Sequence, residues 1–278
     1  MEREEKSQWW GWALVCTYNI FGHERGVIIK KIKRILIFAM VMFTMFFTSI
    51  QIKASASGWG FRKNSTHQIP EIGKYQSVIE GTNSYYVGPS EKSVYLTFDA
   101  GYDNGVLGKI LDTLKEKNIK ASFFLTGDFV KRFPELTIRI VKEGHVACNH
   151  SYSHKRITTL TKSELKKDLE KLENTFYELT NQKMVKYFRP PEGEFDRTSL
   201  LNVKDLGYKT IFWSIAYKDW DTNNQTGVDY CVKTIMNNIH DGAIILMHSV
   251  SSSNQEALPT VIDKITQEGY TFKTVLDL

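Results

Sequence analysis

Two short stretches of this 278-residue chain carry side chains that could hydrolyse an acyl bond together. Residues 97–103 read Thr-Phe-Asp-Ala-Gly-Tyr-Asp, which places the Asp99 carboxylate at the end of an apolar run and just before a turn glycine. Residues 150–154 read His-Ser-Tyr-Ser-His, and two imidazoles at this spacing can bind one metal ion if the segment forms a helical turn. A carboxylate base beside a histidine-bound metal is suited to splitting an acyl bond with water.

Apolar strands and amphipathic helices alternate from residue 93 onward. The predicted strands span 94–98, 121–125, 145–149, 187–189, 210–215, 243–248 and 271–275. The predicted helices span 105–117, 134–143, 162–180, 198–206, 228–240 and 254–269. Nearly all-apolar strands alternating with helices are typical of a parallel sheet shielded by helices. About seven such units predict an α/β fold, a distorted (β/α) barrel with a short N-terminal extension.

Polar residues follow several of these strands. In (β/α) barrels the reacting side chains lie at the C-terminal strand ends and in the loops after them. Each residue alone has a plain structural explanation, such as a turn aspartate or a surface histidine. Together they predict one site at one rim of the barrel, formed by Asp99, His150, His154, Arg189, Asp219 and His248.

Five motifs in order carry a resemblance to a known family. They are Thr97-Phe98-Asp99, His150-Ser-x-x-His154, Arg189-Pro190-Pro191-x-Gly193-x-Phe195, Asp219-Trp220 and Leu246-Met247-His248. The series resembles the polysaccharide deacetylases of the NodB-homology type, carbohydrate esterase family 4, over about residues 93–275.

Further segments are most similar to the sporulation members of that family, which deacetylate N-acetylmuramic acid in peptidoglycan on the way to muramic δ-lactam. These segments include Trp59-Gly60-Phe61 and Asp219-Trp220-x-x-Asn223-Asn224-Gln225. The resemblance therefore implies a hydrolase that removes acetyl groups from N-acetylmuramic acid in peptide-free glycan strands.

The resemblance also implies a role for each motif residue. Asp99 corresponds to the general base, and Arg189 to the cation that holds it in place. His150 and His154 correspond to two ligands of a divalent metal ion (Zn, Co, Mn or Mg). His248 corresponds to the general acid, and Asp219 to the carboxylate that orients it.

Substrate contacts are expected from aromatic residues near the motifs. Phe195 stands where the family uses a backbone N–H to stabilise the oxyanion. The rings of Tyr102, Phe195 and Trp220 are candidate walls for a sugar, whereas Trp213 is interpreted as barrel core.

One position departs from the family pattern. Most members have a second aspartate after the base as third metal ligand, and this chain has Ala100 there. A methyl group cannot coordinate a metal, so weaker metal affinity or a substitute ligand is expected. Two alternatives stay open: a deacetylase of N-acetylglucosamine in peptidoglycan or chitin-like polymers, and a glycan-binding pseudoenzyme.

The N-terminal part predicts export. Residues 1–34 form a long basic region, and the natural start could lie further along, near Val27. Residues 35–52 carry no charge, follow a basic cluster and precede small residues at Ala54 and Ala56, so 35–56 is interpreted as a signal peptide or membrane anchor. Residues 57–92 form an extension, and 93–278 the deacetylase domain. The expected location is extracytoplasmic or membrane-anchored at the wall, or the forespore intermembrane space if the protein is sporulation-specific.

The distribution of charge limits the kinds of molecule that the chain is expected to bind. The net charge of +5 lies mostly in residues 1–56, so the remaining chain is nearly neutral and carries no electrostatic signature of nucleic-acid binding. The expected partner is the peptidoglycan glycan strand, with membrane contact only through the N-terminal segment.

Cys148 and Cys231 are interpreted as buried small residues, although a bridge between them is possible.

Overall fold

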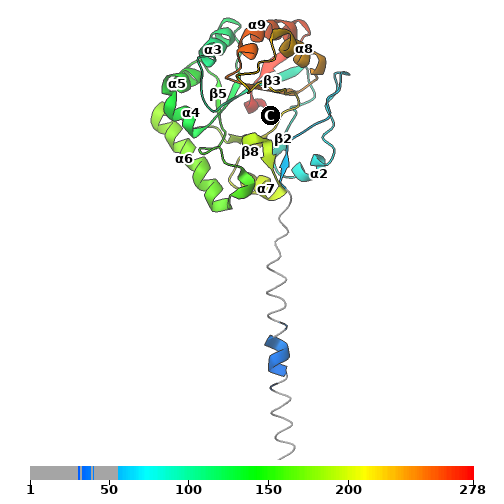
Figure 1. Cartoon of the computed structure of the whole chain (residues 1–278), viewed down its shortest axis with the longest axis vertical. Coiled ribbons are helices and arrows are strands. Elements are labelled where there is room, and N and C mark those ends of the chain that lie inside the picture. Colours follow the sequence, from blue (N-terminus) through cyan, green and yellow to red (C-terminus); the bar gives the residue numbers. More distant parts are fainter. Residues whose placement is uncertain (1–30, 32, 39, 41–55) are drawn as a thin grey trace, which may run out of the picture. The chain divides into compact units, whose positions relative to one another are not determined.

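The computed structural model of this chain describes residues 31, 33–38, 40 and 56–278 (Figure 1). Residues 31, 33–38 and 40 are helical and exposed. The predicted basic region and the leader at 35–56 fall largely outside the described residues, so both stay predictions. Among the residues that the structure describes, no helical segment has the length and hydropathy that a bilayer span requires.

A curled sheet of eight strands forms the centre of the part from residue 56 onward, and all its strand pairings are parallel. Its strand order is β10-β3-β4-β5-β6-β8-β2. Strand β9 lies outside this order and pairs with β3. The strands are β2 (Ser84–Tyr85), β3 (Ser93–Ala100), β4 (Ser122–Leu125), β5 (Val146–Asn149), β6 (Tyr187–Phe188), β8 (Lys209–Ile211), β9 (Ala243–His248) and β10 (Thr271–Lys273). All seven predicted strands are present; β2 was missed because two residues carry no periodic signal.

The sheet bends round until its two ends meet. Ile215, which follows β8, forms a parallel bridge with Ile245 of β9, and Val87, which follows β2, forms an antiparallel bridge with Ala243. Figure 1 looks down this ring, with the helices outside and the C-terminus at its middle. The predicted distorted (β/α) barrel is therefore confirmed.

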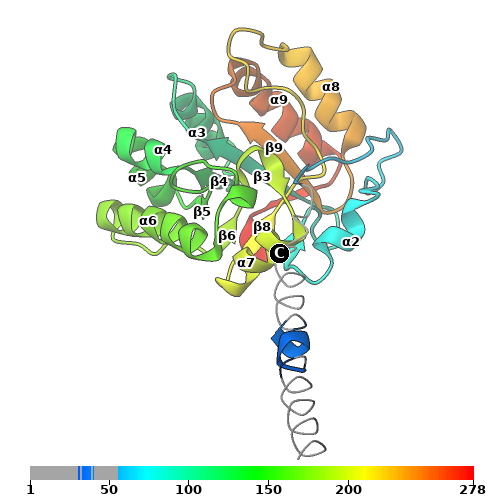
Figure 2. The same cartoon turned by 60° about the horizontal axis from the view of Figure 1, so that its bottom comes forward.

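Helices cover the outside of the sheet, and Figure 2 shows α3 to α6 following one another along one flank while α8 and α9 lie together on the other. They are α2 (Tyr75–Ile79), α3 (Leu107–Glu116), α4 (Gly127–Arg132), α5 (Pro134–Lys142), α6 (Lys162–Thr180), α7 (Arg197–Asp205), α8 (Val228–Asn238) and α9 (Ser252–Gln267). A capping box formed by Thr161 and Glu164 begins α6. Helices α2 and α4 were not predicted, because they are too short to show helical periodicity.

The alternation of side chains along β3 separates the core from the site. Leu96, Phe98 and Ala100 are fully buried in the large apolar cluster that the surrounding helices share. Because successive side chains of a strand point to opposite faces, Thr97 and Asp99 face the barrel interior instead. The last interior position of β3 is therefore the carboxylate.

The N-terminal extension packs on the barrel. Its strand β1 (Ser57–Gly58) pairs antiparallel with β7 (Glu194–Phe195). The ring of Trp59 stacks on Phe212 with 4.2 Å between centroids, and its Nε1 donates a hydrogen bond to the carbonyl oxygen of Trp213 at 2.9 Å. The extension thus contacts the end of the third motif and the residues that follow β8.

Both described cysteines are free. Cys148 and Cys231 are fully buried and form no disulfide. Their interpretation as buried small residues is confirmed, and the possible bridge is absent.

We expect Gly242→Ala to destabilise the barrel closure. Gly242 has a φ of +74°, and a Cβ there would lie 2.6 Å from the backbone oxygen of Gly88. Gly227 has a φ of +84° and a ψ of 160° with open space around it, so Gly227→Ala carries only a backbone penalty of about 1–3 kcal/mol. Urea unfolding should show a larger loss of unfolding free energy for Gly242→Ala than for Gly227→Ala. Equal losses would show that the backbone contact does not constrain the closure.

Candidate active site

An ion pair between Asp99 and Arg189 forms the floor of the site. Asp99 is the second-last residue of β3, and Arg189 directly follows β6. Arg189 Nη1 donates to Asp99 Oδ1 at 2.7 Å, with the guanidinium fully buried and the carboxylate nearly so. The two residues are 90 positions apart, and the curl of the sheet brings them together.

The surroundings of Arg189 fix the direction of its guanidinium. Nε donates to the carbonyl of Ile211 at 3.1 Å, and Nη2 donates to Thr97 Oγ1 at 3.0 Å. The guanidinium lies over the ring of Phe124, with Cζ 4.0 Å from the centroid. A planar group held at three nitrogens and on one face cannot turn away from Asp99.

Opposing effects set the charge of Asp99. Burial by itself raises the pKa of this carboxyl. The positive charge of Arg189 opposes burial, and with smaller contributions from His150 and His248 it holds the pKa below its ordinary value. Asp99 is therefore an anion over the whole neutral range, with one oxygen given to Arg189 and the other directed toward His150.

His150 is held in one tautomer. Its Nδ1 lies 2.8 Å from the carbonyl oxygen of Arg189, so Nδ1 carries the proton and donates it. The other nitrogen, Nε2, then presents a lone pair 3.6 Å from Asp99 Oδ2. Burial lowers the pKa of His150 to about 4, so this imidazole is neutral near pH 7.

His154 reaches the same place by a route that the sequence analysis did not expect. The segment after β5 is not a helical turn: Ser151 and His154 both have positive φ values, 70° and 53°. The loop nevertheless folds the two imidazoles together, with 4.9 Å between the ring centroids of His150 and His154. Desolvation lowers the pKa of His154, which favours its neutral form too.

This pair fits a divalent metal ion as two ligands. Both imidazoles are neutral, and the hydrogen bond from His150 Nδ1 to a carbonyl is the outer contact that metal-bound histidines usually make. Ala100 offers no third ligand, since its methyl group lies in the apolar core. Among the described residues, no group of three or more His, Cys, Asp or Glu side chains is arranged to hold a metal. Any remaining coordination positions would fall to water or substrate.

A second charged pair stands beside Asp99. His248 ends β9 at the position paired with Asp99 in the parallel register of β3 and β9. Its Nδ1 lies 2.6 Å from Asp219 Oδ1, and its backbone N–H donates to Asp219 Oδ2 at 2.8 Å. Burial lowers the pKa of His248, but the hydrogen bond and charge of Asp219 outweigh it, so the pKa is raised. The Asp99 carboxylate and the His248 imidazole thus sit on neighbouring strands.

The aromatic candidates divide into two groups. Trp220 is about half exposed and lies edge-on to His248, 5.5 Å between centroids, and Tyr102 is also exposed. The expectation for Phe195 as a sugar wall is wrong, because its ring is fully buried in a cluster with Phe212. Its backbone pairs with Ser57 of β1. Trp213 is partly buried against the core and beneath Arg189, as the sequence analysis favoured.

Two supporting residues were missed by the sequence analysis. Asp168 of α6 accepts hydrogen bonds from Ser151 Oγ, Tyr152 N and Ser153 N, which holds the loop that carries His154. Asn254 of α9 donates to Asp219. Neither stands at a strand end, so the rule that located the other residues could not find them.

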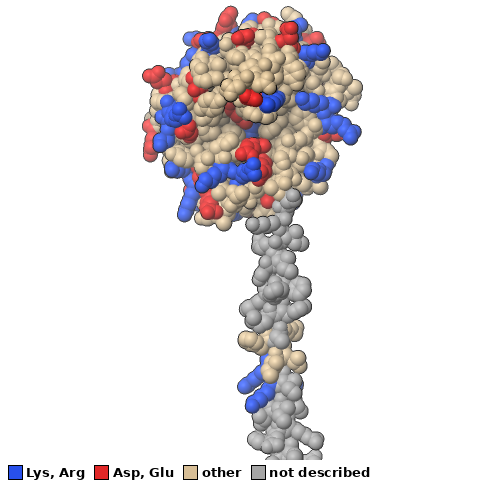
Figure 3. All heavy atoms as spheres, viewed as in Figure 1, with Lys and Arg blue, Asp and Glu red and all other residues tan. Residues whose placement is uncertain are grey.

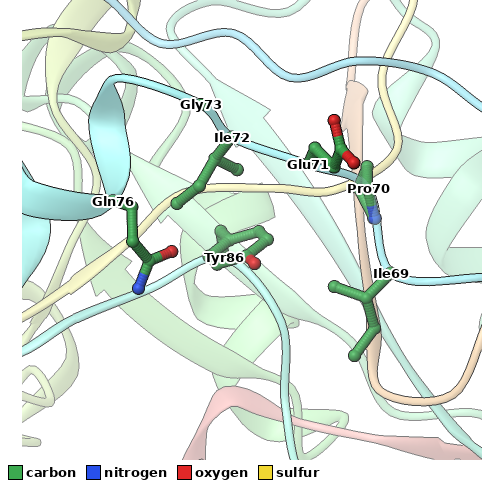
Figure 4. Close-up of a pocket in the computed structure, with 7 residues that line it drawn as sticks. All are labelled: Ile69, Pro70, Glu71, Ile72, Gly73, Gln76 and Tyr86. Carbon is green, nitrogen blue, oxygen red and sulfur yellow. The ribbon is translucent and has the colours of Figure 1, made fainter.

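The site lies apart from two hollows of the described surface. The cavity in Figure 4, about 370 Å³, is lined by residues 69–73 with Gln76 and Tyr86 of the extension. A second hollow of about 500 Å³ includes His67 and Tyr270. The lining of neither hollow includes a candidate site residue. On the face shown in Figure 3, basic and acidic side chains are interspersed.

We expect Arg189→Met to cost about 3–5 kcal/mol of unfolding free energy at pH 7, because it leaves a buried carboxylate unpaired. In the wild type the lowered pKa of Asp99 adds stability above the unfolded value of about 3.9, and this stability is lost as the pH falls. In Arg189→Met, burial is no longer opposed by the guanidinium and raises the pKa of Asp99. The loss of unfolding free energy should therefore shrink as the pH falls through this raised pKa, because Asp99 then becomes neutral.

Urea unfolding at pH 7 and pH 5 measures this difference. Arg139→Met is the matched control, since Arg139 makes partly exposed pairs with Asp112 and Glu143. It should cost about 1 kcal/mol or less at both pH values. A cost for Arg189→Met that does not change with pH would contradict the described balance.

We expect Asp219→Asn to lower the pKa of His248. The change removes the contact that raises this pKa and leaves the burial that lowers it. An NMR titration of the His248 imidazole should give a value below the ordinary 6.5, against one above it in the wild type. Asp221→Asn, which removes the ion pair with Lys218 and keeps a side-chain oxygen that can accept from Asn223 N, is the control and should leave the titration unchanged. An unshifted pKa in Asp219→Asn would rule out the coupling.

Comparisons with known proteins agree with this geometry. A family model for polysaccharide deacetylases matches residues 87–211. The peptidoglycan-N-acetylmuramic acid deacetylase PdaA of Bacillus subtilis is 43% identical over 222 residues, covering 79% of this chain and 84% of that protein. A peptidoglycan-N-acetylglucosamine deacetylase of Bacillus cereus is 34% identical over 181 residues, covering 65% and 64%. The solved structure of B. subtilis PdaA, a family 4 carbohydrate esterase, superposes with a TM-score of 0.78 at 42% identity, over 81% of this chain and 97% of that one. This chain therefore belongs to the polysaccharide deacetylase family, carbohydrate esterase family 4.

Proposed function

We propose that this protein removes acetyl groups hydrolytically from N-acetylmuramic acid in peptidoglycan. The single observation that carries the proposal is the juxtaposition of an ionised carboxylate, Asp99, and a proton-bearing imidazole, His248, on neighbouring strands. Amide hydrolysis needs both a base for the water and an acid for the departing amine. The similarity to PdaA, whose name states this substrate, supports the choice of sugar.

In the proposed reaction, Asp99 accepts a proton from the water that attacks the acetamide carbonyl carbon. The Oδ2 atom is available for this step, because Oδ1 accepts from Arg189. The C–N bond of the resulting tetrahedral species then breaks, acetate leaves, and the sugar nitrogen takes a proton.

His248 is the proposed source of that proton. Its Nδ1–H is engaged by Asp219, so Nε2–H is the free donor when the ring is charged. The raised pKa keeps a larger fraction of the ring charged at neutral pH. Arg189 and Asp219 act by holding these two groups.

His150 and His154 are the proposed ligands of a divalent metal (Zn, Co, Mn or Mg). When bound, such an ion polarises a carbonyl and lowers the pKa of coordinated water. Asp99, 3.6 Å from His150 Nε2, lies next to that position. Tyr102 and Trp220 are proposed to line the groove for the sugar, since both are exposed at the rim.

The setting of the reaction is also proposed from the sequence and the family. Residues 35–56 are proposed to direct export or to anchor the chain, 57–92 to form the extension and 93–278 the catalytic domain. The freed amine of a peptide-free muramic acid can close on the lactyl carboxyl and form muramic δ-lactam. From the resemblance we propose that the protein acts one step before this lactam during sporulation. The proposed location is then the forespore intermembrane space.

Treating peptidoglycan strands with purified protein tests the function. We expect acetate release and loss of acetyl from muramic acid in muropeptide mass spectra, faster on peptide-free than on peptide-bearing strands. Asp99→Asn and His248→Ala should each lower kcat about 10²–10⁴-fold. Asp112→Asn, in an exposed pair, is the matched control and should keep full activity.

Other outcomes would favour the alternatives. Loss of acetyl from glucosamine instead would identify an N-acetylglucosamine deacetylase, as in the Bacillus cereus relative. No acetate release with any of the four metals would favour a glycan-binding protein.

A further inference from the structure

The Asp219 carboxylate accepts a hydrogen bond from the side-chain amide of Asn254, which is shielded from solvent. Asn254 stands in the first turn of α9 and is fully buried. Its Nδ2 donates to Asp219 Oδ2 at 2.5 Å, while Asp219 Oδ1 faces His248 Nδ1 at 2.6 Å. The two carboxylate oxygens are thus divided between Asn254 on one side and the His248 ring on the other.

Tyr217 sets which end of the Asn254 amide faces Asp219. The Tyr217 hydroxyl donates to Asn254 Oδ1 at 2.7 Å. An amide has one acceptor end and one donor end, so a hydroxyl bound at the oxygen leaves the NH₂ group for the carboxylate. The thiol of Cys231, 3.6 Å from the same oxygen, is a weak second donor. Tyr217, Cys231 and Asn254 are all buried, so this arrangement is shielded from water.

A glutamine ties the same loop to the start of α9. Gln225 Nε2 donates to the carbonyl oxygens of Asp219 (3.3 Å) and Asp221 (2.8 Å). Its Oε1 accepts from Ser251 Oγ at 2.6 Å and from Ser253 N at 3.2 Å. The backbone of the Asp219 loop is therefore fixed by Gln225, and its carboxylate by Asn254.

We propose that Asn254 is a positioning residue for proton transfer, which holds the Asp219 carboxylate in the orientation that aligns His248. This rests on the proposed role of His248 as the acid. Without Asn254, the buried Oδ2 keeps only the backbone N–H of His248 as a donor, and the carboxylate can turn to recover a second one. Such a turn lengthens the 2.6 Å contact with the ring. Asn254 itself touches neither substrate nor reacting atoms.

Kinetics and NMR of Asn254→Ala test the proposal. We expect kcat to fall about 10- to 100-fold, the loss typical of a misplaced catalytic group, with KM within about twofold of the wild type. The downfield proton resonance of the His248 Nδ1–H should move upfield, because its hydrogen bond lengthens. Tyr217→Phe keeps the ring and removes only the hydroxyl that orients Asn254, so it should show the same changes at smaller size even if Asn254→Ala folds poorly.

Asn238→Ala is the matched control, since Asn238 Nδ2 donates only to the Thr234 carbonyl within α8. It should change neither kcat nor the resonance. A wild-type resonance in both Asn254→Ala and Tyr217→Phe would overturn the proposal, as would a rise in KM without a fall in kcat. If the wild type releases no acetate, the proposed function fails, yet the resonance still shows whether Asn254 positions the Asp219–His248 pair.

Discussion

The buried contact between Arg189 and Asp99 is the constraint on which the rest of the site depends. A carboxylate at this depth would take up a proton if burial acted alone, and a neutral acid could not accept one from water. The guanidinium prevents this, and it is itself fixed by Thr97, the Ile211 carbonyl and the ring of Phe124. The carbonyl of Arg189 also sets the tautomer of His150. Arg189, directly after β6, therefore determines the charge of the proposed base and the tautomer of a proposed metal ligand.

The barrel supplies two charged pairs of opposite purpose on one rim. Asp99 with Arg189 keeps a carboxylate ionised, whereas Asp219 with His248 favours a charged imidazole. Burial opposes the charged form in both pairs, and a specific partner outweighs it in both. Because β3 and β9 are neighbours in parallel register, the two pairs sit side by side. Such separation of pKa values is what lets one site remove a proton and supply another.

Much of this arrangement could be predicted from the sequence. The strand-end rule located Asp99, His150, Arg189 and His248, since apolar runs and the residues after them are local features. The conformation around His154 could not be predicted, because it depends on Asp168 from a helix that follows in the chain. The buried ring of Phe195 was missed for a similar reason: strand β1 and Trp59 pack over it from more than a hundred residues away. Contacts made by tertiary packing leave no periodic signal.

The pH dependence of kcat/KM for the wild-type enzyme on peptidoglycan strands shows whether an ionised Asp99 works together with a charged His248. We expect activity to persist into weakly acidic solution, because the pKa of Asp99 is lowered, and to decline only above the ordinary histidine value of about 6.5, where His248 loses its proton. An activity that keeps rising through alkaline pH would show that no charged imidazole is needed. Either that result or a loss of activity already near pH 6 would contradict the proposal that Asp99 acts as an ionised base and His248 as a charged proton donor.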